Sequence, residues 1–252
     1  MTAGRTELLV NRFARAIATY ERQAVVQREA AERLASLMGR ELRVLAPRIL
    51  EIGCGTGLLT RRLVSRFAPS EIVLNDLCPD MGICFSNLPR SRFVPGDAQC
   101  LDFPGRFDAI ASASVVQWFS DLSAFAKKCA NALAKGGVLA LSAFGPDTLP
   151  EIAALTGRGL TYPDPEAFAA VFAEYFEPRH IGREHRRLVF SDASAVLRHL
   201  KETGVTATGG SDGPWTRSRL AALTADYAKR FPAAEGGVVL TYDPCWFVGV
   251  RR

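Results

Sequence analysis

The sequence lacks the features that would indicate metal or disulfide chemistry. Its six cysteines form no CxxC pair, which argues against a zinc site or a dithiol redox centre. There are only three histidines, and we expect His180, His185 and His199 to be structural or on the surface. We predict no metal site, and we expect the cysteines to be reduced thiols of a cytoplasmic protein, namely Cys54, Cys78, Cys84, Cys100, Cys129 and Cys245.

Long apolar runs and dense basic runs are also missing. No stretch is long enough to cross a bilayer and no signal peptide is recognisable, so we expect no membrane association. The net charge of +5 is too small and too scattered for a typical nucleic-acid-binding protein, although it suits an acidic protein partner. The 252 residues, of which 48% are hydrophobic, are enough for one large α/β domain, which we expect to be monomeric.

The most informative stretch is a glycine turn between an apolar run and an amphipathic segment. Ile49 to Ile52 has the composition of a buried strand, and Leu58 onward has helical spacing. Between them, Gly53, Gly55 and Gly57 alternate with Cys54 and Thr56, so a ligand can approach the backbone closely. The helix that follows adds free N–H groups and a positive dipole end. We therefore expect a polar or anionic group to bind over residues 53–57, with Cys54 in the turn.

The spacing of the glycines narrows the choice of ligand. The dinucleotide fingerprint needs glycine at its sixth position, where this chain has Leu58, and no Gly-Lys-Ser/Thr follows for a phosphate loop. Glu51, just before the first glycine, would repel a pyrophosphate but suits a cation. S-adenosylmethionine (SAM) carries an ammonium, a sulfonium and a carboxylate. We predict that its carboxylate lies at the helix end and that Glu51 serves its cationic part.

Further ligand residues are expected where the later strands end. Asp76 ends the run Glu71–Asp76 about twenty residues past the glycine turn, where a carboxylate can accept from ribose hydroxyls. Asn75 is the alternative if the register slips by one residue. The other predicted ligand residues follow Asp76 or come at the ends of the next strands, where they would contact adenine or leave room for the ligand. They are Leu77, Met81, Asp97, Ala98 and Ser112. A position in the core is nearly as compatible with Met81.

The order of apolar runs predicts a doubly wound α/β fold. Five strand–helix units up to Phe144 favour a mostly parallel, Rossmann-like sheet. Strands over 185–190 and 238–250 bring the total to seven, the last two forming a C-terminal antiparallel hairpin at the sheet edge. We divide the chain into a helical N-terminal cap (1–46, interrupted at Gly39), a core (47–145) and a C-terminal part with helical insertions (146–252).

The motifs resemble those of class I SAM-dependent methyltransferases. Leu50–Gly57 is similar to their first motif, whereas Phe13–Tyr20, Val116–Trp118, Leu200–Ala207, Thr216–Leu220 and Leu240–Tyr242 are similar to the malonyl-acyl carrier protein O-methyltransferases of biotin synthesis. This resemblance implies SAM as methyl donor and the free carboxyl of a malonyl thioester on acyl carrier protein as acceptor. It also implies that Tyr20, Gln117 and Trp118 line the acceptor pocket, although helical spacing alone favours a core position for Tyr20.

Two questions stay open at this level. Arg179, Arg183, Arg186 and Arg187, with Arg198 and Lys201, form either a docking site for the acidic carrier protein or a solvated basic face. The rival functions are methylation of another small carboxylic acid or quinone precursor, and a SAM-binding assembly factor that transfers no methyl group. The sequence does not identify the arginine that holds the malonyl carboxylate.

Overall fold

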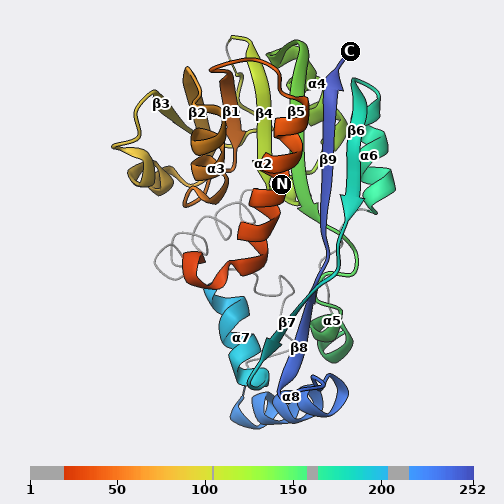
Figure 1. The fold of residues 1–252 in the computed structure, drawn as a ribbon. Helices are drawn as coiled ribbons and strands as arrows, with labels where there is room; N and C mark the ends of the chain where they lie inside the picture. Colours follow the sequence, from red (N-terminus) through yellow and green to blue (C-terminus); the bar gives the residue numbers. More distant parts are fainter. Residues whose placement is uncertain (1–19, 104, 158–163, 204–215) are drawn as a thin grey trace.

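The computed structural model describes residues 20–103, 105–157, 164–203 and 216–252, which form a main sheet layered with helices and a smaller lobe beside one of its edges (Figure 1). The first nineteen residues of the expected cap, which include residues 13–19 of one family motif, and residues 204–207 of another motif lie outside the described residues. Within them, no helix is both long and apolar enough to cross a membrane.

The main sheet has seven strands in the order β3-β2-β1-β4-β5-β9-β6. The first five pair in parallel, whereas β9 lies antiparallel to both β5 and β6. This confirms the doubly wound class and places the reversal of strand order between β1 and β4, where such folds bind ligands. The bounds are β1 Arg48–Ile52, β2 Glu71–Asp76, β3 Ser91–Pro95, β4 Phe107–Ala113, β5 Leu133–Phe144, β6 Phe176–Arg183 and β9 Pro244–Arg251.

Helices cover both faces of this sheet, which explains why its central strands β1, β2, β4 and β5 are apolar without alternation. Ile49 packs with α2 and α3 on one face, and the adjacent Leu50 packs with α4 and α6 on the other. The predicted interruption at Gly39 is wrong, because α2 continues through it; a Cβ there would lie 2.5 Å from Arg66 Nε, so glycine allows α3 to approach. The bounds are α2 Val25–Glu41, α3 Leu58–Phe67, η1 Pro79–Phe85, η2 Val116–Trp118, α4 Leu122–Ala132 and α6 Pro165–Ala173.

The smaller lobe has its own core and a two-stranded sheet of β7 (Arg186–Phe190) and β8 (Val238–Tyr242). Around it lie α5 (Pro150–Thr156), α7 (Ala193–Glu202) and α8 (Arg217–Arg230), below the main sheet in Figure 1. Asp192 and Thr216 are the N-caps of α7 and α8. Their side chains accept from the backbone N–H groups of Ala195 and Arg219, each three residues later.

The expected C-terminal hairpin is present, but its strands differ from the prediction. The single strand expected over 238–250 is two strands, β8 and β9, separated at Asp243. The strand expected over 185–190 is β7, which pairs with β8 outside the main sheet. In the main sheet β9 pairs with β5 and with β6, and β6 was not predicted. Its exposed alternate residues and its Pro178 obscure the strand pattern, and an edge strand tolerates both.

Candidate functional site

A cavity opens at the carboxyl ends of β1, β2 and β4, beneath the N-terminal end of α2. The glycine turn after β1 forms one wall, and the segments after β2, β3 and β4 form the others. The structure therefore gathers most of the predicted site residues around one space, namely Tyr20, Glu51, Gly53, Cys54, Gly55, Asp76, Leu77, Met81, Asp97, Ala98 and Trp118.

The glycine turn is fastened to the end of β2 by backbone hydrogen bonds. The N–H groups of Gly53 and Cys54 donate to the carbonyl oxygen of Asn75 at 2.8 and 2.9 Å. Gly53 and Gly55 both have positive φ angles, of 69° and 50°, which favour glycine. Burial raises the pKa of the Cys54 thiol, with a further contribution from Glu51, so this side chain is a neutral part of the wall.

The structure distinguishes Asp76 from its alternative, Asn75. The Asn75 amide donates to the carbonyl oxygens of Val94 and Gly96, at 2.9 and 3.0 Å, and so ties β2 to β3. The Asp76 carboxylate accepts from the N–H groups of Gly55 and Cys78, at 2.8 and 2.9 Å, and burial raises its pKa. Each carboxylate oxygen retains a second lone pair, so Asp76 can still accept from ribose hydroxyls.

Glu51 is the most unusual group in the cavity wall. Its side chain is buried, with the residue 1% exposed, and its Oε2 atom has no hydrogen-bond partner among the described residues. Burial raises the pKa of Glu51 to about 8, and the negative charge of Asp76 contributes to the rise. A buried carboxylate oxygen without a partner is costly, whereas a cationic ligand would satisfy it. The residues present thus fit the ammonium end of SAM.

The loop after β3 is held from outside the cavity by Lys128 of α4, which sequence reasoning missed. Its ammonium donates to the carbonyl oxygens of Ala98, Gln99 and Leu101 at 3.2, 2.6 and 2.8 Å. Asp97 accepts from the N–H of Gln99 at 2.9 Å. The lysine therefore fixes the shape of the loop on which Asp97 and Ala98 reach the cavity.

Tyr20 lines the same cavity rather than the core that its helical spacing favoured. Burial, and then the charge of Asp76, raise the pKa of Tyr20 to about 12. Its phenol therefore stays protonated at physiological pH and can donate a hydrogen bond. Trp118, at the end of the short helix η2, is another lining residue.

Three predicted residues do not line the cavity. Ser112 is fully buried and its hydroxyl donates to the Ile52 carbonyl oxygen at 2.8 Å, because the strand's pleat turns it away from the space that Ala113 and Ser114 border. The Gln117 amide donates to the Ser114 carbonyl oxygen at 2.8 Å and stabilises the turn. Gly57 is the N-cap of α3, where a Cβ would lie 3.0 Å from the Phe85 ring.

Two residues of the cavity wall that were not predicted as ligands have buried polar atoms without partners. Gln27, on α2, and Thr56, in the glycine turn, are 5% and 8% exposed, and their Oε1 and Oγ1 atoms have no partner among the described residues. Gln27 could not be predicted from the sequence, because a glutamine in an amphipathic helix usually faces solvent.

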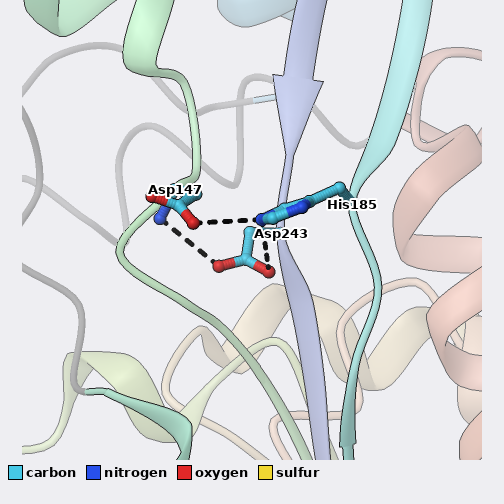
Figure 2. Close-up of side chains that lie close together, drawn as sticks. All are labelled: Asp147, His185 and Asp243. Atoms are coloured by element: carbon cyan, nitrogen blue, oxygen red, sulfur yellow. Dashed lines mark hydrogen bonds and ion pairs between the residues drawn. The ribbon is translucent and has the colours of Figure 1, made fainter.

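A second cluster of titratable groups lies where the two sheets meet. Figure 2 shows Asp147, His185 and Asp243, whose potential metal-ligating atoms all lie within 4.8 Å of one another. The Arg183 guanidinium already supplies a positive charge here, since it donates to Asp243 at 2.8 Å, lies 2.9 Å from His185 Nε2 and pairs with Asp147. We therefore interpret the group as an ion-pair cluster that joins β5, β6 and β9 at the junction with the smaller lobe.

The other two histidines also lie outside the cavity wall. His180 pairs with Glu41 at 2.8 Å, and buried His199 lies 2.9 Å from the Tyr242 hydroxyl. Burial lowers the pKa of His199, so its imidazole is neutral at physiological pH. Among the described residues, the cavity therefore offers carboxylates, amides and aromatic groups but no imidazole base.

Comparison with known proteins identifies the family. Residues 50–141 match the methyltransferase domain family. The chain is 39% identical to a malonyl-acyl carrier protein O-methyltransferase of Porphyromonas gingivalis, over 96% of this chain and 95% of that one. It is also 39% identical to the protein of that name from Bacteroides fragilis, over 97% of this chain but only 50% of that longer protein.

Solved structures agree with the fold. The YcgJ protein of Bacillus subtilis superposes with a TM-score of 0.62 at 16% identity, covering 87% of this chain and 98% of its own. The likeness at this identity concerns the fold alone, whereas the Porphyromonas gingivalis relative matches in sequence over nearly its whole length. This chain therefore belongs to the malonyl-acyl carrier protein O-methyltransferase family.

Proposed function

We propose that this protein transfers a methyl group from SAM to the free carboxyl of a malonyl group carried on acyl carrier protein, at the early, pimeloyl-forming stage of biotin synthesis. The observation that carries this proposal is the buried Glu51 carboxylate, whose unpartnered oxygen lies in the same cavity wall as the glycine turn and Asp76. The names of the relatives support the acceptor. We also propose that the protein acts as a monomer in the cytoplasm.

The cavity suits a reaction that needs no general base. SAM supplies an electrophilic methyl group, and a malonyl carboxylate is already ionised at neutral pH because carboxyl pKa values lie near about 4. The protein's task is then to hold donor and acceptor in line and exclude water, which can contribute roughly 7–11 kcal/mol. Asp76 would hold the ribose, the glycine turn and Glu51 would hold the amino-acid end, and Tyr20 and Trp118, which line the same cavity, would border the acceptor.

The direct test is incubation of the purified protein with SAM and malonyl-acyl carrier protein, followed by mass spectrometry of the carrier. A gain of one methyl group that fragmentation locates on the free carboxyl of the malonyl group would support the proposal. Transfer only to a free small carboxylic acid would favour the rival acceptor, and SAM binding without any transfer would favour the assembly factor. Complementation of a biotin-requiring strain would test the place in biotin synthesis.

Tyr20→Phe is expected to lower the rate of methyl transfer by about tenfold or more, because the variant loses a hydrogen-bond donor to a charged acceptor. The SAM dissociation constant should change little, since the ring is retained. Steady-state kinetics and calorimetry would measure the two effects. Tyr175→Phe is the matched control, because Tyr175 lies at the end of α6 outside the cavity wall. An unchanged rate for Tyr20→Phe would remove Tyr20 from the mechanism.

Several arginines of the basic cluster over residues 179–201 are already paired with acidic side chains. Arg186 makes a two-fold ion pair with Glu29, Arg179 pairs with Glu177 at 3.1 Å, and Arg183 belongs to the junction cluster. Arg187 is exposed on β7, and no ion pair is found for it among the described residues. We propose that Arg187, with Arg198 and Lys201 of α7, contributes most to docking of the acidic carrier.

Arg187→Glu should therefore raise the Michaelis constant for malonyl-acyl carrier protein by roughly 3- to 10-fold at low salt, because it replaces attraction by repulsion. The Michaelis constant for the small thioester malonyl-coenzyme A should rise less. Arg179→Glu, whose arginine already has acidic neighbours, is the matched control and should have the smaller effect. Equal effects of Arg187→Glu on the carrier-bound and small thioesters would argue against docking at this surface.

A further inference from the structure

Gln27 lies in the cavity wall although it belongs to α2 and not to the sheet edge that holds the other predicted ligand residues. Ala31, four residues later on the same helix face, also lines the cavity. The helix is anchored behind this face, since Ala30 and Ala31 pack in one core with Cys54 and Leu59, and the Trp246 indole donates to the Ala30 carbonyl oxygen at 3.3 Å. Gln27 is thus held at a fixed position relative to the glycine turn.

The Gln27 side chain lacks the partner that its burial requires. The residue is 5% exposed, and its Oε1 atom is buried without a hydrogen-bond donor among the described residues. Glu51 Oε2, in the same wall, is in the same condition. Two buried acceptors without partners, on residues that line one cavity, indicate a ligand group with several donors, because an unsatisfied buried acceptor is costly.

The charge of the pair identifies the kind of donor. Glu51 contributes a negative charge, and burial with Asp76 nearby disfavours that charge until a cation arrives. An ammonium carries three N–H donors and a positive charge, so it can satisfy the carboxylate and the amide oxygen together. The hydroxyl of Thr56 is both donor and acceptor and does not distinguish between ligands.

We propose that Gln27 Oε1 and Glu51 Oε2 together bind the α-ammonium of the amino-acid part of SAM. This inference rests on the proposed function and adds to it a ligand residue from the cap. The cosubstrate would then bridge α2 and the sheet, so that binding its amino-acid end fastens α2. The segment before α2, which carries Tyr20, is joined to it by a hydrogen bond from the Ala24 N–H to the Tyr20 carbonyl oxygen.

The test compares Gln27→Met, which keeps the side-chain length but removes the acceptor, with Gln23→Met. Gln23 is the matched control because its amide oxygen lies 3.4 Å from His199 Nδ1, away from the cavity wall. Calorimetry would measure binding of S-adenosylhomocysteine and of its deaminated analogue, which keeps the carboxylate and the adenosine. Thermal melting without ligand would show that Gln27→Met folds, since the change removes an unsatisfied buried atom.

Gln27→Met is expected to weaken S-adenosylhomocysteine binding by about tenfold and to leave binding of the deaminated analogue within about twofold. Gln23→Met should not change the ratio of the two affinities. An equal loss for both ligands, or no loss for either, would overturn the assignment of Gln27. If the unaltered protein binds neither compound, the proposed function itself fails, and this outcome is distinguishable from the other two.

Discussion

Glu51→Gln is expected to weaken SAM binding by about 100-fold while making the ligand-free protein more stable. The glutamine keeps the shape of the side chain but removes the negative charge that pairs with the cosubstrate. It also removes the cost of burying an ionisable group whose Oε2 has no partner. At pH 7 the gain in the free energy of unfolding should be on the order of 2 kcal/mol. The combination of higher stability and weaker SAM binding is the result that identifies the role of Glu51.

The raised pKa of Glu51 also predicts how stability and SAM affinity change with pH. The folded pKa of Glu51 is about 8, above its ordinary value of 4.5, because burial and then Asp76 disfavour the charge. Between these values the folded protein holds a proton that the unfolded chain releases, so stability falls as the pH rises through this window and levels off above about 8. SAM affinity should instead rise as the pH approaches 8, because the charged form binds the cation. Glu51→Gln should flatten both profiles.

Glu151→Gln provides the contrast. Glu151 is also buried, at 4% exposed, but its carboxylate accepts from the hydroxyl and the N–H of Thr241. This substitution should lower stability and leave SAM affinity unchanged. Melting curves between about pH 6 and 9, together with calorimetry, would measure both properties. Tight SAM binding by Glu51→Gln would contradict the role of Glu51.

Gly53→Ala is expected to destabilise the protein by about 3 kcal/mol and to abolish SAM binding. The residue has a φ of 69°, and a Cβ there would lie 2.2 Å from a methyl carbon of Val115. The substitution therefore adds strain of the left-handed backbone to displacement of the turn after β4. Denaturant unfolding and calorimetry would measure the two losses.

Gly55→Ala separates the strain of the left-handed backbone from the collision with a neighbouring side chain. Its φ is 50°, but nothing lies within 4 Å of a Cβ at this position, which borders the cavity. We expect a loss of only about 1 kcal/mol in stability from the backbone conformation. SAM binding should still weaken, because the new methyl group occupies space beside the ligand. Equal destabilisation by the two alanines would show that Val115 yields easily and that the strain alone dominates.

The sequence predicted the main sheet well because its strands are buried on both faces. Runs such as Ile72–Leu74 and Leu139–Leu141 have no polar interruption, and the helices between them have clear apolar periods. The sixth strand was missed because it is an edge strand that alternates exposed residues and contains Pro178. The break of the last strand at Asp243 was missed because its cause, an ion pair with Arg183, comes from sixty residues away.

The predictability of the site followed the same rule. Residues at or just past the end of a strand, such as Glu51, Asp76 and Asp97, could be placed because parallel strands end at one edge. Ser112 and Gln117 were misplaced because the direction of a side chain at a strand end depends on the pleat and on local hydrogen bonds. Gln27 could not be found, because the position of the N-terminal helix over the sheet depends on tertiary packing.

The position of β9 has a consequence for the order in which the protein forms during synthesis. Residues 244–251 lie between β5 and β6, and β6 pairs with no other strand of the described sheet. Until these residues leave the ribosome, residues 176–183 have no neighbour to bond with, although they were translated some sixty residues earlier. A nascent chain stalled before Pro244 should therefore expose an open strand edge, which is a target for chaperones and for aggregation.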